Sequence, residues 1–302
     1  MPLSAALKPL WRQPGYAWMV IATLAVCLGA NVSIFSIVDS VLLRPLPAPD
    51  ADDIVLMANE YPNLGAGEVT WSSGGDYVDR LERVTALSDQ ALFREVSRTL
   101  ESQDGAERLQ GMEATPSLFD VLRIYPASGR AFDESEAVPG AARSVILSDG
   151  LRRRLFPGGE AVGRQVRLDG EPYTVVGAMP EGFLFYAPDS EFWIPLALTD
   201  EQRQAHHSND WYNIGRLRPG ASIEQAQTQI DVINAADLER STPSLKEGLL
   251  RAGFETRTIR LRDYLVRNVE SSLYLLWAGA FLVLLIGALN CAGLVIARTG
   301  AR

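Results

Sequence analysis

The chain has 302 residues, of which 47% are hydrophobic, and its 37 acidic residues outnumber the 28 lysines and arginines to give a formal net charge of −9. Such a chain can bury a sizeable core, so the composition excludes a disordered protein. An acidic chain rarely offers the basic face that phosphate neutralisation requires, so we expect no nucleic-acid partner.

The charges are spread unevenly along the chain. Every acidic residue lies between Asp39 and Glu270, whereas both ends carry only basic charges. The two cysteines, Cys27 and Cys291, lie in the apolar end segments, so the middle of the chain cannot rely on disulfides. The sequence therefore predicts an acidic, cysteine-free domain between two apolar ends.

The N-terminal part of the chain predicts two helices. Residues 1–15 place apolar side chains at helical spacing and indicate a short cytoplasmic helix on the membrane surface. Residues 16–43 predict a first transmembrane helix, because the uncharged run at 16–38 is longer than the ~20 residues that span a bilayer. A secretory signal peptide is the alternative, and we reject it because the apolar run continues well past Cys27.

Residues 48–127 predict the first part of an α+β domain. A strand is expected at Ile54–Met57, and a capping box at Ser73–Asp76 predicts the start of a helix. Residues 87–111 then alternate as paired strands do.

Residues 128–205 predict a mostly β insertion. Apolar and polar residues alternate on both sides of Asp169-Gly170, which is a strong hairpin signal. Arg152, Arg153 and Arg154 are expected on the solvent side of a short helix, where they could contact lipid headgroups or an acidic partner.

Residues 206–268 predict the second part of the α+β domain. A strand is expected at 212–218, a capping box at Ser222–Gln225 begins a helix, and Thr258–Leu265 is expected to be a strand. Two strand-helix-strand units around an insertion predict a split βαβ fold.

Residues 271–297 predict a second transmembrane helix, because this uncharged run is the most apolar stretch of the chain. Residues 298–302 would begin a cytoplasmic loop. Basic residues flank both spans on the side away from the central domain, and such residues favour the cytoplasm. We therefore predict cytoplasmic termini and a central domain outside the cytoplasm, with four topology anchors: Lys8, Arg12, Arg298 and Arg302.

Polar and small residues inside the predicted spans indicate helix packing, since polar groups are costly when they face lipid. They could pack the two spans against each other or against helices of other segments or chains. The predicted packing residues are Asn31, Ser33, Ser36, Gly287, Asn290 and Gly293.

The sequence predicts no catalytic, cofactor-binding or metal site, and no enzyme activity. The glycines of residues 158–165 approach a phosphate loop, but Arg164 and Gln165 stand where lysine and a hydroxyl residue are required. His206 and His207 are the only histidines. As neighbours in an extended segment they point in opposite directions and cannot easily chelate one metal ion, so we expect them in a solvated loop.

Ordered motifs along nearly the whole chain carry a family resemblance. They are Pro14–Tyr16, Leu28–Val38, Leu42–Pro47, Val145–Leu151, Phe156–Gly159, Val162–Arg164, Leu168–Pro180, Phe192–Leu196, Arg216–Ala226 and Leu284–Arg298. Together they resemble the MacB/FtsX-like permeases of ABC transporters, in particular the duplicated permeases of soil bacteria.

The resemblance implies a fold, a function and partners. It implies a porter-like lobe with an inserted sabre-like lobe, and mechanotransmission in which a separate cytoplasmic ATPase moves a periplasmic domain. The implied partners are that ATPase, a second permease copy, a periplasmic adaptor or substrate protein, and the lipid of the inner membrane. The family's further spans and coupling loop would follow Arg302, so we expect a fragment of a longer permease; the alternative is that another chain supplies the missing spans.

Two other functions remain open on the sequence alone. An FtsX-like scaffold would bind a periplasmic partner without transport, and a membrane-anchored hydrolase is a more distant alternative that would have to use one of the two histidines.

Overall fold

The computed structural model describes residues 18, 21, 22, 25–33, 48–64, 71–102 and 105–300, with α9 side chains at 261–267, 275–289, 292 and 293. The chain divides into two compact units. The end unit comprises residues 1–45 and 266–302, and the central unit comprises residues 46–265.

The central unit is a mixed α/β domain. Its strands are β1 Ile54–Glu60, β2 Leu87–Ser102, β3 Gly105–Ala114, β4 Ser128–Gly129, β5 Ser144–Leu147, β6 Gln165–Leu168, β7 Glu171–Ala178, β8 Phe192–Pro195, β9 Tyr212–Leu217 and β10 Glu255–Arg260. Its helices are α3 Gly74–Arg83, α4 Leu118–Leu122, α5 Asp149–Leu155, α6 Asp200–Gln204, α7 Ile223–Arg240 and α8 Pro243–Ala252, with short 3-10 turns η2 Ala51–Asp53, η3 Pro62–Leu64 and η4 Glu134–Glu136. Helix α9, Leu261–Gly300, begins in this unit.

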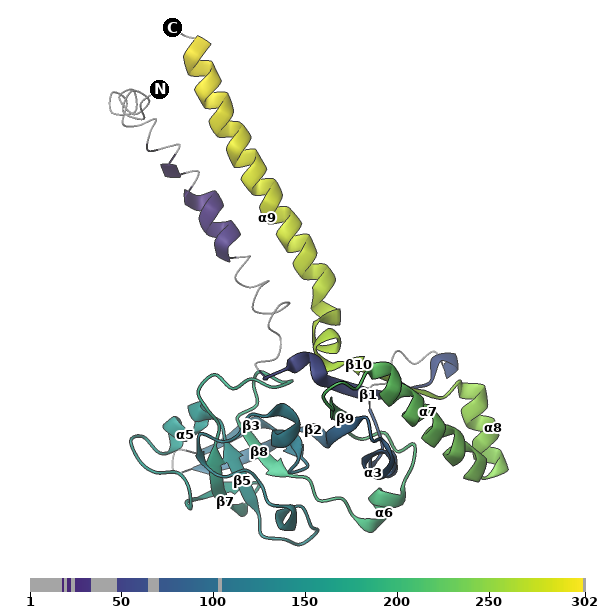
Figure 1. Cartoon of the computed structure of the whole chain (residues 1–302). Helices are drawn as coiled ribbons and strands as arrows, with labels where there is room; N and C mark the ends of the chain where they lie inside the picture. The colour runs from purple at the N-terminus through teal and green to yellow at the C-terminus, as the bar shows by residue number, and fades with distance from the viewer. Residues whose placement is uncertain are drawn as a thin grey trace. The chain divides into compact units, whose positions relative to one another are not determined.

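All ten strands form one sheet in the order β10-β1-β9-β2-β3-β8-β5-β7-β4, and β6 pairs with β2 and β7 (Figure 1). Strand β1 lies between β9 and β10 and is antiparallel to both. The first and last strands of the central unit are therefore neighbours. Strands from the predicted insertion 128–205 join the same sheet through the parallel pair β3 and β8 and the antiparallel pair β2 and β6, so the division into two lobes stays a prediction.

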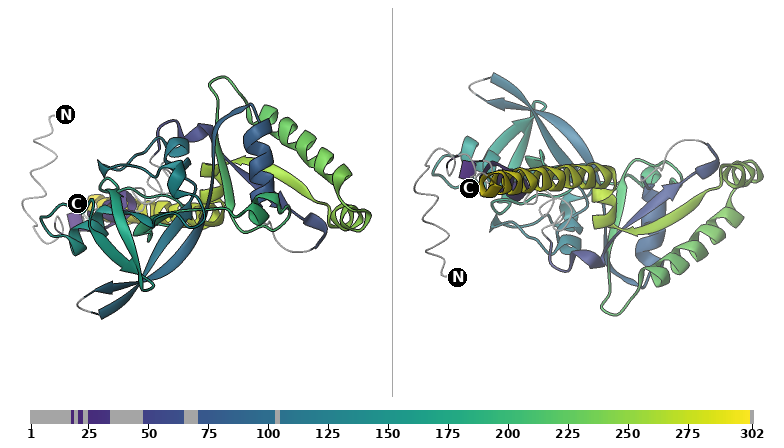
Figure 2. Two further views of the ribbon diagram at one scale, coloured as in Figure 1. Left: turned by 90° about the horizontal axis from the view of Figure 1, so that it is seen from below. Right: turned by 90° about the horizontal axis from the view of Figure 1, so that it is seen from above.

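The two faces of this sheet are covered by different helices. Figure 2 shows α3 and α7 side by side against the strands β1, β9 and β10. Val55 and Met57 of β1 pack on this face against Ile230 of α7. Ile54 and Leu56 pack in the other main cluster, with Phe119 of α4. The period of two along β1 thus gives two separate cores.

Several local predictions are confirmed by the structure. Ser73 and Asp76 form the capping box of α3, and Ser222 and Gln225 form that of α7. Residues 169 and 170 connect β6 to β7 with φ values of 50° and 81°, as a two-residue hairpin turn requires.

The predicted strand Thr258–Leu265 is wrong in its second half. Strand β10 ends at Arg260, opposite Val55, and only Ile54 of β1 remains beyond that pair. The chain becomes helical at once, and Leu261 is fully buried in the core. Helix α8, which the sequence analysis did not predict, follows α7 and precedes β10 along the chain.

In the end unit, residues 25–33 are helical, and α9 runs to Gly300. Over the residues that the structure describes, no helix combines the length and the apolar character needed to cross a membrane. The expected spans 16–43 and 271–297 therefore stay predictions, and the helix expected at 1–15 lies outside the described residues.

Candidate functional site

The candidate site is the junction where both ends of the central unit come together. The chain approaches β1 through residues 48–53 and leaves β10 into α9, and these two strands pair side by side. Arg262 at the start of α9 forms an ion pair of 2.8 Å with Asp52, which precedes β1. Both side chains are well exposed, so this pair adds little stability, but it marks how close the two connections lie.

A buried arginine holds the incoming segment. Arg216 of β9 donates from Nε to the carbonyl of Val121 at 2.7 Å. Its other guanidinium nitrogens donate to the carbonyls of Asp50 and Pro49 at 3.1 and 3.0 Å. The rigid fork of a guanidinium suits three convergent carbonyls. Arg216 thus fixes the chain just before β1 and ties it to α4.

Three tyrosines hold the outgoing segment. Tyr186 of the β7–β8 connection lies 4.6 Å, between ring centroids, from Tyr212 of β9 and is stacked 6.4 Å from Tyr264 of α9. Burial raises the pKa of Tyr186, and its hydrogen bonds to the hydroxyls of Tyr212 and Tyr264 raise it further. Tyr186 adopts a φ of 58°, a region that non-glycine residues rarely occupy. The start of α9 is therefore packed on two other segments of the central unit.

A second buried arginine, Arg80 of α3, organises the opposite face of the sheet. Its guanidinium is fully buried and donates to Ser72, Asn213, Asn59 and Thr256 at 2.7 to 3.2 Å. These acceptors come from residues before α3 and from β9, β1 and β10. One side chain thus connects α3 to three neighbouring strands of the junction.

Asp76 supplies the counter-charge of Arg80. Its carboxylate lies 3.9 Å from the guanidinium and accepts from Asn59 at 2.7 Å. Burial alone would raise the pKa of Asp76, but Arg80 and the hydrogen bonds of Asn59 and Ser73 outweigh it and hold the pKa below its usual value. Burial lowers the pKa of Arg80, against the opposing charge of Asp76. The pair is therefore ionised inside the core.

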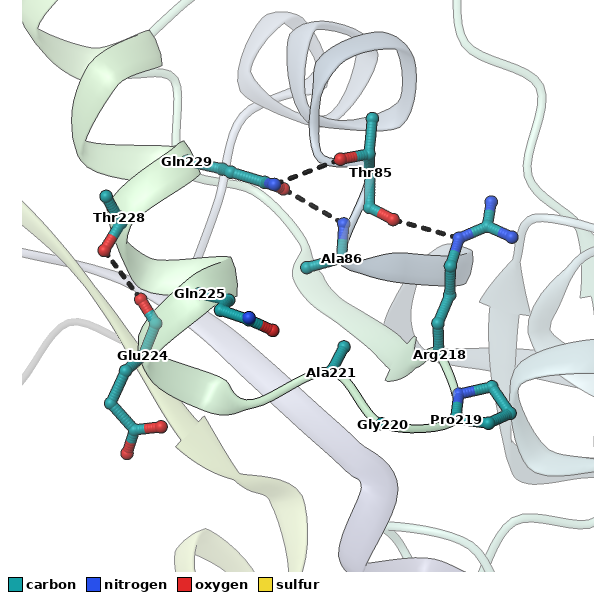
Figure 3. Close-up of a pocket in the computed structure, with 10 residues that line it drawn as sticks. All are labelled: Thr85, Ala86, Arg218, Pro219, Gly220, Ala221, Glu224, Gln225, Thr228 and Gln229. Atoms are coloured by element: carbon teal, nitrogen blue, oxygen red, sulfur yellow. Dashed lines mark hydrogen bonds between the residues drawn. The ribbon is translucent and has the colours of Figure 1, made fainter.

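A groove of about 660 Å³ lies between α7 and the turn after β9 (Figure 3). Its polar groups already bond one another: Gln229 donates to Thr85 and accepts from Ala86, both at 3.0 Å. Arg218 donates to the carbonyl of Thr85 at 2.9 Å. The arrangement holds α7 to the sheet and leaves few groups to recognise a ligand.

The two histidines do not share one environment. His206 is partly exposed and faces Asp79, whereas His207 is half-buried, with its ring 4.7 Å from Phe254. Burial lowers the pKa of His207. The interpretation of this segment as a simply solvated loop is therefore wrong for His207, because the apolar ring of Phe254 covers it.

The predicted packing residues are partly placed in the end unit. Asn31 donates to the carbonyls of Cys27 and Ala280 at 2.9 and 3.0 Å, and so connects its helix to α9. At Gly287, a Cβ atom would come within 2.8 Å of the Cys27 sulfur, so the missing side chain permits the approach.

The remaining predicted residues do not join this contact or are not described. Ser33 donates to Gly29 within its own helix, and Gly293 has open space around it. Ser36, Lys8, Arg12 and Arg302 lie outside the described residues, as do the side chains of Asn290 and Arg298. Their roles stay predictions.

Comparisons with known proteins agree with this architecture. A family model described as the MacB-like periplasmic core domain matches residues 17–233. The "Macrolide export ATP-binding/permease protein MacB" of Chromobacterium violaceum is 26% identical over 168 residues, which are 55% of this chain and 24% of that protein. This chain thus spans about a quarter of the length of that relative.

Solved structures share the fold at low sequence identity. The periplasmic region of MacB from Actinobacillus actinomycetemcomitans has a TM-score of 0.52 at 11% identity, covering 73% of this chain and 94% of its own. A solved domain from Porphyromonas gingivalis has a TM-score of 0.51 at 15% identity, covering 71% and 93%. These likenesses show the fold of the central unit.

Proposed function

The chain belongs to the family of ABC transporter permeases with the MacB-like periplasmic core domain, and from this premise we propose that it works by mechanotransmission. A separate cytoplasmic ATPase would bind and hydrolyse ATP, and membrane helices would carry the resulting motion to the central unit. The central unit would then push, release or gate a substrate outside the cytoplasm. The family is an inner-membrane family with a periplasmic domain.

The observation that carries this proposal is the absence of any linker between β10 and α9. Strand β10 ends at Arg260 and α9 begins at Leu261, which is fully buried in the core. The start of the helix is further held by the contact of Tyr264 with Tyr186. A helix that begins inside a packed core transmits displacement to that core, whereas a flexible linker would absorb it.

A two-span topology is part of the proposal. The sequence supports it with uncharged runs at 16–38 and 271–297. The described residues of α9 support it with large apolar side chains that have no cover, such as Leu275 at 75% and Leu289 at 62% exposure. Exposed apolar surface of this kind is unfavourable in water and is expected where lipid or another helix provides the surroundings.

The proposed partners follow from the family. They are a cytoplasmic ABC ATPase, a second permease copy, and a periplasmic adaptor or substrate protein. A Cβ atom at Gly279 or Gly293 of α9 would meet nothing within 4 Å, so a further helix could approach α9 closely at these glycines.

The proposal is tested by isolating the tagged chain from its native membranes after cross-linking. We expect an ABC ATPase among the captured proteins. Hydrogen exchange of residues 46–265 in that complex should then change on addition of ATP, most of all at β1, β10 and the start of α9. Exchange that is the same with and without ATP, in a complex that hydrolyses ATP, would contradict mechanotransmission and favour a scaffold.

A further inference from the structure

Three ionisable side chains meet beside the outer end of α3. Asp79 of α3, His206 of the loop after α6 and Asp237 of α7 each bring one ligand atom to within 4.8 Å of the others. The Nε2 atom of His206 lies 2.9 Å from Oδ2 of Asp79. Two carboxylates and one imidazole from three separate segments thus converge at a surface that solvent can reach.

The orientation of the imidazole is fixed from its other side. Nδ1 of His206 lies 3.1 Å from the carbonyl oxygen of Gln204. A carbonyl only accepts, so Nδ1 carries a hydrogen, and Nε2 is the nitrogen that faces Asp79. Without a metal, Nε2 of the protonated ring can donate to Asp79 at 2.9 Å, and a metal ion would take the place of that proton. A backbone carbonyl behind Nδ1 is also the usual support of a histidine that binds metal through Nε2.

The histidine loop is held rigidly against α3. Gly75 donates from its backbone to the carbonyl of Ala205 at 2.9 Å, and a Cβ atom at Gly75 would come within 2.8 Å of that oxygen. Because Asp79 lies one helical turn after Gly75, this contact places His206 directly beside it. The pairing is therefore built into the backbone of both segments.

We propose that Asp79, His206 and Asp237 bind a divalent transition-metal ion of the Zn²⁺ type. Imidazole and carboxylate ligands suit Zn²⁺, and water would take the remaining position. Ligand atoms of a tetrahedral site lie roughly 3.3 Å apart, so Asp237 must turn inward and release Arg240, which is 3.4 Å away and 70% exposed. This inference does not depend on the proposed transport role.

The bound ion would connect α3 to α7. These two helices cover the same face of β1, β9 and β10 and are neighbours. A ligand that binds only the folded state stabilises it by mass action. We therefore expect metal to raise the melting temperature of the central unit by roughly 5 to 10 °C at a hundredfold excess over Kd.

The test uses the full chain in detergent with a histidine-free affinity tag, titrated with Zn²⁺ by calorimetry after chelator treatment. We expect one ion per chain, and at least a tenfold weaker affinity in His206→Gln and in Asp237→Asn. Asp231→Asn is the matched control, because Asp231 lies on the same helix, is exposed and does not belong to the cluster. It should bind as the wild type does.

A second measurement guards against misfolded variants. Bound Co²⁺ should give a visible d–d absorption that Asp231→Asn retains and that both test variants lose. Thermal melting of the metal-free variants must match that of the wild type for the loss to count, and Asp237→Asn alone decides if His206→Gln unfolds. The proposal is overturned if the wild type binds no ion, or if all three variants bind alike.

Discussion

Arg80 is the buried charge that connects α3 to the sheet, so its removal should be costly. In Arg80→Met, Ser72 loses the guanidinium donor, and Asn59 and Thr256 each keep only one of two side-chain donors. Asp76 is left as an unpaired buried charge. We expect a loss of about 3 to 5 kcal/mol in the free energy of unfolding, measured by urea denaturation. Arg108→Met, an exposed arginine of β3, should change it by less than about 0.5 kcal/mol. Equal effects would contradict the role of Arg80.

The same network predicts a pH dependence. The folded state holds the pKa of Asp76 below its ordinary value, so the ionised carboxylate stabilises the fold in full above about pH 5. This contribution is lost as the pH falls through the folded-state pKa. In Asp76→Asn it is absent at every pH, so the difference in unfolding free energy between wild type and variant should be largest near neutral pH. A difference that does not shrink towards about pH 3 would exclude this account.

Buried arginines are the residues that the sequence analysis missed. Arg216 occupies the same face of β9 as Tyr212 and Ile214, a face that alternation marks as core. A charge at such a position was the available signal. Its partners could not be inferred, because the carbonyls of Asp50 and Val121 belong to segments far away along the chain. Side-chain pairing across such separations depends on the assembled sheet.

At the scale of elements, the contact between α9 and the helix around Cys27 can be tested by a disulfide. A Cβ atom at Gly287 would lie 3.6 Å from Cβ of Cys27, within the range that disulfides require. In a Cys291→Ser background, Gly287→Cys should therefore cross-link to Cys27 under mild oxidation. Proteolysis between the two helices should leave fragments that separate only after reduction.

The matched control for this cross-link is Gly293→Cys in the same background. Its Cβ atom would have nothing within 4 Å, so it should not link to Cys27. Linkage of both variants would indicate unspecific contact, and linkage of neither would mean that the two helices do not pack through this face.

The tyrosine cluster should couple energetically across two elements. Tyr186 and Tyr264 stack at 6.4 Å with an interplanar angle of 11°, and such pairs contribute about 0.5 to 1.5 kcal/mol beyond burial. A double-mutant cycle with Tyr186→Ala and Tyr264→Ala should give a coupling of this size in urea denaturation. Tyr125, which is 52% exposed, should show none with Tyr264. A coupling energy near zero between Tyr186 and Tyr264 would show that this contact does not stabilise the attachment of α9 to the central unit.

Elements with local signals were predictable, and those decided by tertiary context were less so. The capping boxes of α3 and α7 marked both helices from the sequence alone. Helix α8 carried comparable signals, with Thr242 before Pro243 at its start and Gly253 at its end, but these were missed. The switch from β10 to α9 had no local signal, because it occurs opposite the N-terminal end of β1, a strand far away in the sequence.

At the scale of the whole molecule, the order of strands and helices was largely predictable and the joining of the parts was not. Two strand-helix-strand units around a β-rich insertion were inferred from periodicity. Their union into one sheet depends on the parallel pairing of β3 with β8 and the antiparallel pairing of β2 with β6, which no sequence pattern marks. The same holds for the cluster of Asp79, His206 and Asp237, since these residues lie far apart in the sequence, on two helices and a loop, and no spacing connects them.

The proposed orientation of the chain can be tested by cysteine labelling in intact cells. In a background with Cys27 and Cys291 replaced by serine, single cysteines are placed at Arg108, Glu247, Lys8 and Arg302. The first two positions are exposed in the central unit, so a membrane-impermeant thiol reagent should label them in intact cells whose outer membrane is permeabilised. The other two should react only after the inner membrane is opened, because basic flanks favour the cytoplasm.

Each pattern of labelling has one meaning for the proposed topology. Protection of the cysteines at 108 and 247, with reaction at 8 and 302, would show the opposite orientation, in which the central unit lies on the same side of the membrane as the ATPase. Reaction at all four positions in cells with a sealed inner membrane would show that no membrane separates the chain ends from the central unit. Only the predicted asymmetry leaves the junction of β1, β10 and α9 where it could convert a cytoplasmic motion into movement outside.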